Sequence, residues 1–339
     1  MRQGIDKKYL ISLILVIALT ICIFFVSLCV GRYSISLSDC ISILLRGPDA
    51  EFDGDPTAVN VIFLLRLPRT LASLLIGMAL SVSGLVYQTT FNNKLISPDI
   101  LGVSSGACVG AATAIMLHLS QTMISCFAFV FGLVSVGIAL LIPKLIRSSS
   151  NLSLVLSGVI INSFMNSAIG LLKFLADPNK QLADITFWIM GSIAGVRYSD
   201  LAILFPIVSV IVIFLFLLRW KINVISEGEE NAQSLGMDFK RMRLLIIICS
   251  TLLTASTVCI SGAIGWVGLI IPHISRFAVG EDHRKNIPFT IFAGGLFMMA
   301  VDLMARSLSM NEIPLSIISG FIGTPLYIIL LARKDKGNV

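Results

Sequence analysis

Long apolar runs recur along the whole chain, and they constrain its fold more than any other feature. Of the 339 residues, 56% are hydrophobic and 13% are charged, and the mean hydropathy is +0.94. A soluble domain carries roughly 25% charged residues, and a soluble chain this apolar would expose large hydrophobic patches. Runs of about 20 apolar residues suit helices that cross a bilayer. The sequence therefore predicts an all-α, polytopic membrane protein that forms a single domain over residues 1–339.

The apolar runs predict about ten membrane-spanning helices. They lie at about residues 10–30, 67–88, 99–118, 122–142, 152–174, 201–218, 244–262, 265–279, 287–305 and 314–332. The eighth run is short and follows the glycine-rich segment "SGAIGWVG", so we expect a broken or tilted segment packed inside the protein. The first run is expected to remain as an uncleaved span, because its apolar part is too long for a signal peptide and no A-x-A site follows it.

The distribution of Lys and Arg predicts that both termini are cytoplasmic. With ten spans and the N-terminus inside, 17 of the 25 Lys and Arg residues lie on the inner side and eight on the outer side. Cytoplasmic loops of membrane proteins carry such an excess. The outer residues are Arg32, Arg46, Arg66, Arg69, Lys173, Lys180, Arg197 and Arg306. Because the basic residues lie in short clusters between apolar runs, we expect no nucleic-acid binding despite the net charge of +6.

The ionisable and nucleophilic residues form no catalytic or metal-binding pattern. The seven cysteines include no C-x-x-C pair, and no G-x-x-x-x-G-K-[ST] segment is present to bind ATP. Asp302 is the acidic residue well inside a span, and it precedes Arg306 by four residues, which is the spacing of a helical ion pair. We therefore predict no catalytic residue, no metal site and no cofactor bound by this chain, and we do not expect it to be an enzyme.

Three classes of membrane protein each require recognisable residues or loops within the spans. An intramembrane enzyme would need a nucleophile and base, or two carboxylates, at membrane depth. A channel would need a filter-like loop or rings of charge. A secondary ion-coupled carrier usually places ionisable groups or unwound helices near the midplane, and this class stays the alternative. The spans are poor in these features and therefore favour a transport subunit that is driven by an energy source on another protein.

Three arginines are expected at outer helix ends. Arg66 and Arg69 flank Pro68 in "LLRLPRTLASLLIG", and Arg306 ends the ninth run. Arginine usually prefers the cytoplasmic side. By residue type alone, these side chains either extend to lipid phosphates or bind an external partner.

The longest cytoplasmic loop is expected to contain a short helix. It covers about residues 219–243, "RWKINVISEGEENAQSLGMDFKRMR". Ser226 with Glu229 three residues later predicts a capping box at the helix start, and Gly236 suits the helix stop. Such a helix either lies on the bilayer or forms a surface for another protein.

Six ordered motifs resemble one family of permeases. They are "LRLPRTLASLLIGMALSVSGLVYQTTFNNKLISPDILGVSSGA" (64–107), "GEENAQSLG" (228–236), "GAIGWVGLIIPHISRF" (262–277), "GEDHR" (280–284), "DLMAR" (302–306) and "EIPLSIISGFIGTPLYIILL" (312–331). The chain resembles the FecCD-like permease subunits of type II ABC importers for iron–siderophore chelates, haem and vitamin B12. The resemblance covers nearly the whole chain. It implies ten spans, both termini inside, and a place in a bacterial cell (inner) membrane.

The resemblance also implies partners. They are a second permease, identical or related, two cytoplasmic subunits that bind ATP and Mg²⁺, and an extracytoplasmic substrate-binding protein. A ferric siderophore is the expected cargo, with haem, vitamin B12 and oxyanions such as molybdate as alternatives.

Roles for particular residues follow from the same resemblance. Docking of the binding protein falls to Arg66, Arg69 and Arg306, which we expect to form an exposed positive platform at the outer face. Coupling to the ATPase falls to Ser226, Gly228, Glu229, Glu230, Leu235 and Gly236. The translocation path and gate fall to Gln88, Asn92, Asn93, Pro98, Ser150 and Asn151, although Asn92 and Asn93 equally suit a turn. The chain departs from many relatives in having "NKLISP" where they carry "NPLA-P".

Overall fold

The helices of this chain form one bundle around a central buried helix. The computed structural model describes residues 7–48, 56–147, 150–309 and 311–336. All regular structure in these ranges is helical, as the sequence predicts. The elements are α1 (Lys7–Cys29), α2 (Leu37–Arg46), α3 (Pro56–Asn60), the π-helix η1 (Val61–Arg66), α4 (Leu67–Thr90), the 3₁₀-helix η2 (Pro98–Leu101), α5 (Val103–Met116), α6 (Gln121–Leu145), α7 (Asn151–Leu175), α8 (Gln181–Met190), α9 (Tyr198–Leu217), α10 (Arg219–Ser226), α11 (Glu229–Ser234), α12 (Phe239–Ser261), α13 (Val267–Val279), α14 (His283–Ser307) and α15 (Leu315–Lys336).

Seven of these helical segments are long and apolar enough to cross a membrane, counted over the described ranges. They are Lys7–Cys29, Thr57–Thr90, Gln121–Leu145, Asn151–Leu175, Tyr198–Leu217, Phe239–Ser261 and His283–Ser307. Three shorter apolar helices, α5, α13 and α15, fall in the other predicted runs. The chain is therefore a multi-pass membrane protein, and the count of ten crossings stays a prediction.

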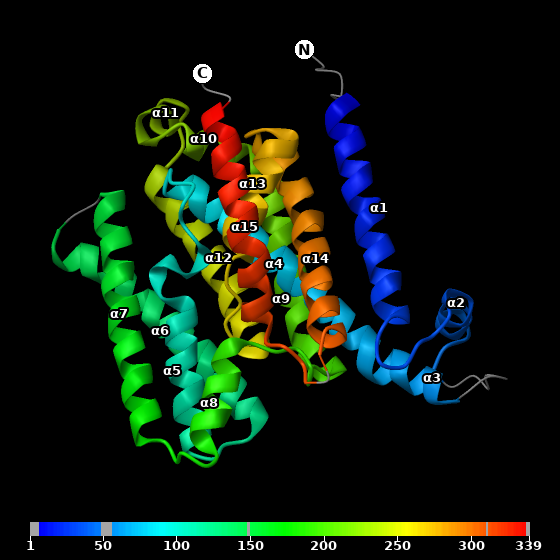
Figure 1. Cartoon of the computed structure of the whole chain (residues 1–339). Coiled ribbons are helices and arrows are strands. Elements are labelled where there is room, and N and C mark those ends of the chain that lie inside the picture. Colours follow the sequence, from blue (N-terminus) through cyan, green and yellow to red (C-terminus); the bar gives the residue numbers. More distant parts are fainter. Residues whose placement is uncertain (1–6, 49–55, 148–149, 310, 337–339) are drawn as a thin grey trace.

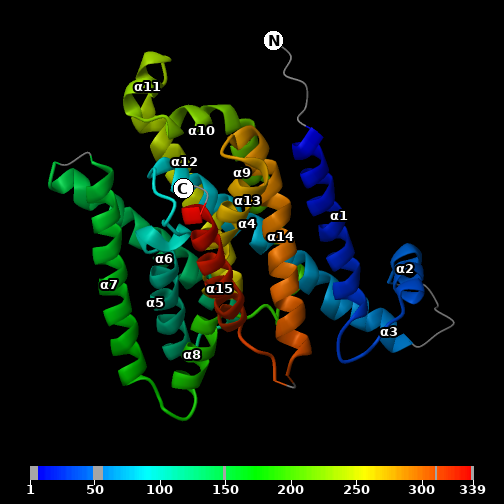
Figure 2. The same ribbon diagram turned by 45° about the horizontal axis from the view of Figure 1, so that its top comes forward.

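The central helix α4 is buried along nearly its whole length. It packs against α9, α12, α13 and α14. Small residues permit this close packing: a Cβ on Gly77 would lie only 2.1 Å from the carbonyl oxygen of Gly294. Figures 1 and 2 show α5, α6, α7 and α8 on one side of this central group and α1, α2 and α3 on the other.

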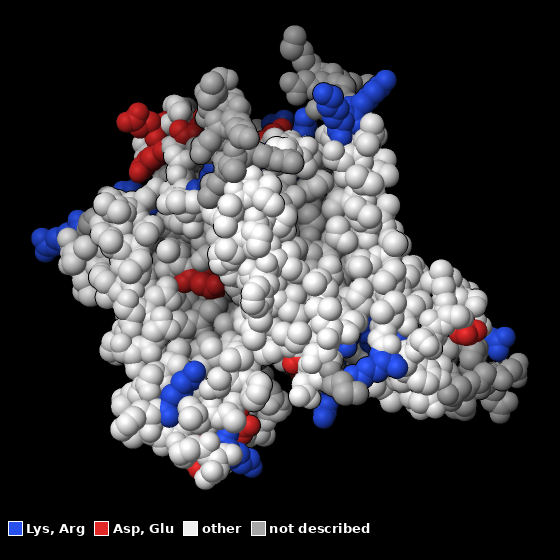
Figure 3. Space-filling view, in the orientation of Figure 1, with Lys and Arg blue, Asp and Glu red and all other residues white. Residues whose placement is uncertain are grey.

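The two ends of the bundle differ in what they carry. Figure 1 shows the start of α1, the end of α15, α10 and α11 at one end, which we name the coupling end, and α2, α3 and α8 at the opposite end. In Figure 3 the charged side chains on the visible face gather mostly toward these two ends, and the surface between them is largely uncharged apart from acidic atoms in a hollow. This distribution suits a chain whose middle lies in lipid.

Candidate functional site

The segment 219–243, which we name the coupling segment, folds into two short helices rather than the single capped helix that the sequence predicts. Ser226 ends α10, and its hydroxyl donates to the Asn223 carbonyl oxygen at 2.6 Å. The prediction of a capping box at Ser226 and Glu229 is therefore wrong, because the serine hydroxyl is hydrogen-bonded to the preceding turn. The residue that precedes α11 is Gly228, whose φ of +95° suits glycine.

Gly236 ends α11 as predicted. Its φ is +74°, and its N–H donates to the Gln233 carbonyl oxygen at 2.9 Å. This is the left-handed residue that commonly follows a helix. Beside it, Leu235 is 64% exposed, and both Glu229 and Glu230 lie on the surface in the first turn of α11. The coupling segment thus presents an apolar residue and two carboxylates at the coupling end.

A polar cavity of about 670 Å³ lies directly beneath the coupling segment. It brings together the end of α4, the turn that follows it, α10, α11, α13 and the start of α14. Its lining includes Gln88, Thr89, Asn92, Asn93, Lys94, Asn223, Ser226, Glu227, Asn231, Leu235, Arg276, Asp282 and His283. Residues predicted for the translocation path and residues predicted for coupling therefore share one cavity.

The path residues have local roles as well. Gln88 accepts a hydrogen bond from Arg276 Nη1 at 2.6 Å, which joins α4 to α13. Asn93 Oδ1 accepts from the Leu95 N–H at 2.9 Å, and Asn92 has a φ of +49°. This geometry is that of an asparagine-stabilised turn, so the turn role of Asn92 and Asn93 is confirmed.

Three other predicted residues lie outside this cavity's lining. Pro98 begins η2 and packs against Gly268 of α13, where a Cβ would lie 2.3 Å from its ring. Ser150 caps α7, since its hydroxyl accepts from the Ser153 N–H at 3.1 Å, and Asn151 is the first residue of that helix. The gate assigned to Ser150 and Asn151 stays a prediction.

The arginines at the opposite end are buried, contrary to the expectation that they form an exposed platform. Arg66, Arg69 and Arg306 are only 5%, 8% and 9% exposed. Arg66 Nη1 donates to the carbonyl oxygens of Leu28 at 2.7 Å and Cys29 at 2.9 Å. It thereby holds the end of α1 against η1.

Arg69 and Arg306 belong to one charge network. Arg69 pairs with Asp302 at 2.8 Å and with Glu312 at 2.7 Å. Arg306 donates from Nη2 to Ser27 Oγ at 2.7 Å, and its Nε lies 3.8 Å from Asp302. These side chains are engaged inside the chain because buried guanidinium groups need partners. The exposed-platform expectation is wrong, and docking of a binding protein by these arginines stays a prediction.

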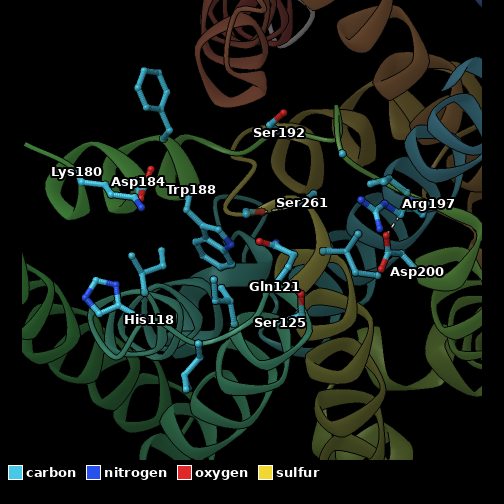
Figure 4. A pocket seen from close by; sticks show the side chains of 18 residues that line it. His118, Gln121, Ser125, Lys180, Asp184, Trp188, Ser192, Arg197, Asp200 and Ser261 are labelled. Atoms are coloured by element: carbon cyan, nitrogen blue, oxygen red, sulfur yellow. Dashed lines mark hydrogen bonds between the residues drawn. The ribbon is translucent and has the colours of Figure 1, made fainter.

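A second cavity, of about 800 Å³, opens at the end opposite the coupling segment. Figure 4 shows Lys180, Asp184 and Trp188 along one wall, with His118, Gln121 and Ser125 facing them. Arg197 and Asp200 lie at the far side. The lining comes from the α5–α6 connection, α8, the start of α9 and the end of α12.

This cavity was not predicted as a site. Its walls come from three stretches far apart in the sequence, residues 115–125, 180–200 and 260–262, so no local motif marks it. The available signal was the placement of Lys180 and Arg197 among the outer cations. Its mixed lining, with an indole and charged groups of both signs, can contact a polar ligand with apolar parts.

Comparisons with known proteins agree on one family. The sequence model of the FecCD transport family matches residues 18–333. The molybdate import system permease protein MolB of Haemophilus influenzae is 37% identical over 339 residues, which cover 100% of this chain and 99% of that protein. A protein of Helicobacter pylori named as a probable iron chelatin transport system permease is 35% identical over 329 residues, 96% of this chain and 98% of its own.

One solved structure matches closely. It is described as an inward-facing conformation of a proposed metal-chelate type ABC transporter. Its chain has 36% identity and a TM-score of 0.85, with 95% of this chain and 98% of that chain covered.

Proposed function

The chain belongs to the FecCD transport family, and on that basis we propose that it is the membrane-spanning permease subunit of a binding-protein-dependent ABC importer. ATP and Mg²⁺ bind to two separate cytoplasmic subunits, and hydrolysis there drives transport. The chain spans a bacterial cell (inner) membrane about ten times, with both termini in the cytoplasm. The observation that carries this proposal is the position of the coupling segment, which lies over a polar cavity at the end where α1 starts and α15 ends.

Within the coupling segment, α11 suits contact with a protein better than contact with the bilayer. Helices that lie on membranes are rich in Lys and Arg on their polar face. The six residues of α11, "EENAQS", include two glutamates and no basic residue. Leu235, which is exposed directly after α11, adds an apolar contact to the same segment, and protein interfaces commonly combine an apolar centre with a polar rim. We therefore assign the surface of α11 to an ATPase subunit.

The exposed faces of other helices suit a second permease. Phe164 and Phe174 on α7 and Phe321 on α15 are large exposed apolar side chains. In a membrane such residues face either lipid or a neighbouring helix. A dimer with an identical or related permease would cover part of this surface.

A ferric siderophore is our proposed cargo. The cavity at the opposite end has about 800 Å³, within the range of pockets that hold drug-sized ligands. This volume suits an organic iron chelate delivered by an extracytoplasmic binding protein. Molybdate is the second candidate, because the similarity to MolB runs over the full length of this chain.

Cargo uptake in cells with and without this gene separates the two candidates. We expect deletion to abolish uptake of a radiolabelled ferric hydroxamate siderophore and to leave radiolabelled molybdate uptake unchanged. The opposite pattern would replace the iron chelate with molybdate. Uptake of both probes at the wild-type rate would contradict both assignments.

Labelling of single cysteines tests the orientation. In a background without native cysteines, Glu229→Cys should react with a membrane-impermeant thiol reagent only after the cell is opened. Lys180→Cys should react from outside intact cells. Reaction of position 229 from outside would contradict the proposed topology.

A further inference from the structure

His283 is a buried side chain that joins three helices at the coupling end. It is 4% exposed and is the first residue of α14. Its ring Nε2 lies 2.6 Å from Thr89 Oγ1 on α4, and its Nδ1 lies 2.7 Å from Asn223 Oδ1 on α10. We name His283, Thr89 and Asn223 the histidine joint. Each of its members comes from a different helix.

The hydrogen bonds around Asn223 fix the orientation of its amide. The backbone N–H of His283 donates to Asn223 Oδ1 at 2.8 Å, and Asn223 Nδ2 donates to Asp282 Oδ1 at 2.6 Å. The oxygen therefore faces the ring, so Nδ1 must carry a proton to donate to it. In a neutral ring, Nε2 then accepts the proton of the Thr89 hydroxyl.

Thr89 has a second partner for the same proton. Its Oγ1 lies 2.8 Å from the Leu85 carbonyl oxygen within α4. One hydroxyl proton can serve one acceptor at a time. The contact between α4 and His283 can therefore form and break while the threonine keeps a hydrogen bond within its own helix.

The joint lies where the coupling segment meets the central helix. α10 packs against α4, α9 and α14, and α11 packs against α10 and α12. α4 in turn contacts α9, α12, α13 and α14. A displacement of α11 thus reaches the core of the bundle through α10, and the joint is a polar connection on that route.

We propose that His283 is a positioning residue that transmits movement of the coupling segment to α4, and so couples ATP hydrolysis to the movement of cargo. This proposal rests on the proposed function as an ABC importer permease. While the contact at Thr89 is formed, His283 holds α10 through Asn223 and α4 through Thr89, so the two helices move together. The contact at Thr89 is the part of the joint that can be removed without disturbing Asn223.

Two adjacent threonines provide a matched test. Thr89 and Thr90 are both buried, and each hydroxyl lies within hydrogen-bond distance of the carbonyl oxygen four residues earlier in α4. The contact with His283 belongs to Thr89. Thr89→Val and Thr90→Val thus each remove a hydroxyl group from neighbouring positions. Only Thr89→Val also removes the contact with His283.

The experiment uses the importer purified with its own ATPase subunits and reconstituted in vesicles. The cargo probe is the ferric hydroxamate siderophore, or molybdate if the deletion strain identifies that anion. We expect Thr89→Val to lower the amount of cargo moved per ATP by about fivefold, the effect of one buried hydrogen bond, at unchanged ATPase content. Thr90→Val should match the wild type, and His283→Gln combined with Thr89→Val should be no worse than His283→Gln alone.

Other outcomes would overturn the proposal. Equal cargo per ATP in Thr89→Val and Thr90→Val would exclude the joint as a coupling element. A loss of protein stability or ATPase content in Thr89→Val, with cargo per ATP unchanged, would assign it a merely structural role. Failure of the proposed function itself looks different: the wild-type chain would then purify without ATPase subunits and show no ATP-dependent uptake.

Discussion

Arg69 on α4 and Asp302 on α14 form a buried ion pair, with 2.8 Å between Nε and Oδ1, although 233 residues separate them in the sequence. Glu312 also pairs with Arg69, and Arg306 lies on the other side of Asp302. The network therefore contains two arginines and two carboxylates, so its charges balance. It ties α4, α14 and the segment before α15 together at the end opposite the coupling segment.

Removing one member of this pair should be costly. Asp302→Asn leaves Arg69 buried without its main partner, and we expect a loss of about 3–5 kcal/mol in the free energy of unfolding. Arg241→Gln is the matched control, because Arg241 pairs with Asp238 but its side chain is 90% exposed. Such a surface pair contributes less than about 1 kcal/mol. Thermal unfolding in detergent would measure both variants, and equal losses would contradict the role given to the network.

The close packing of α4 predicts a strong effect of a single added methyl group. Gly77→Ala would place a Cβ 2.1 Å from the Gly294 carbonyl oxygen. We expect it to lower the stability by about 1–3 kcal/mol or more, since overpacking displaces the backbone of α14. Gly137→Ala on α6 is the control, because within the described ranges no other helix comes within 4 Å of the methyl group that alanine would add there. A normal melting temperature for Gly77→Ala would mean that α4 and α14 are not packed this closely.

The cap of α14 predicts a dependence of stability on pH. Burial of Asp282 acts to raise the pKa of its carboxyl, but hydrogen bonds from the Arg284 N–H and the Asn223 amide, with the charges of Arg284 and Lys285, hold that pKa below its usual 3.8. As the pH falls below the usual carboxyl pKa, the unfolded chain therefore binds more protons at this aspartate than the folded chain does. The stability that the carboxylate contributes should be complete above about pH 4 and be lost as the pH falls through the lowered pKa.

Asp282→Asn isolates this contribution. Asparagine can still cap the helix, but it does not titrate. The variant should be less stable than the wild type at pH 7, and the difference should shrink below about pH 4, the range in which a free aspartate is protonated. Melting temperatures in detergent from pH 7 to pH 3 would measure it. A difference that stays constant with pH would show that the carboxylate does not act in this way.

Gly236 predicts a specific effect on coupling. Proline cannot adopt its φ of +74°, whereas asparagine tolerates the left-handed region. Gly236→Pro should therefore reorient α11, and ATPase subunits should co-purify at well under half of the wild-type amount. Gly236→Asn should retain them nearly fully. Equal co-purification with both variants would argue against the contact assigned to α11.

The fold class can be predicted from the sequence because each helix that lies in lipid appears as a long apolar run. All ten predicted runs contain an apolar helix, and Gly236 ends α11 where expected. The prediction for Ser226 is wrong since a capping pattern does not show that the preceding turn already engages the hydroxyl. The sequence does not predict the burial of the arginines, because Glu312, which pairs with Arg69, is far from Arg69 along the chain. The histidine joint could not be predicted for the same reason. The motif "GEDHR" identifies the histidine but not its partners on α4 and α10.

The energy source of transport is the property that separates an ABC importer from a secondary carrier. The complex of this chain with its ATPase subunits would be reconstituted in vesicles with the binding protein outside, and uptake of the radiolabelled cargo would be measured. We predict that uptake requires ATP at the ATPase side and persists when an ionophore collapses the proton gradient. Uptake that survives without ATP but disappears with the proton gradient would contradict this account and identify a secondary carrier.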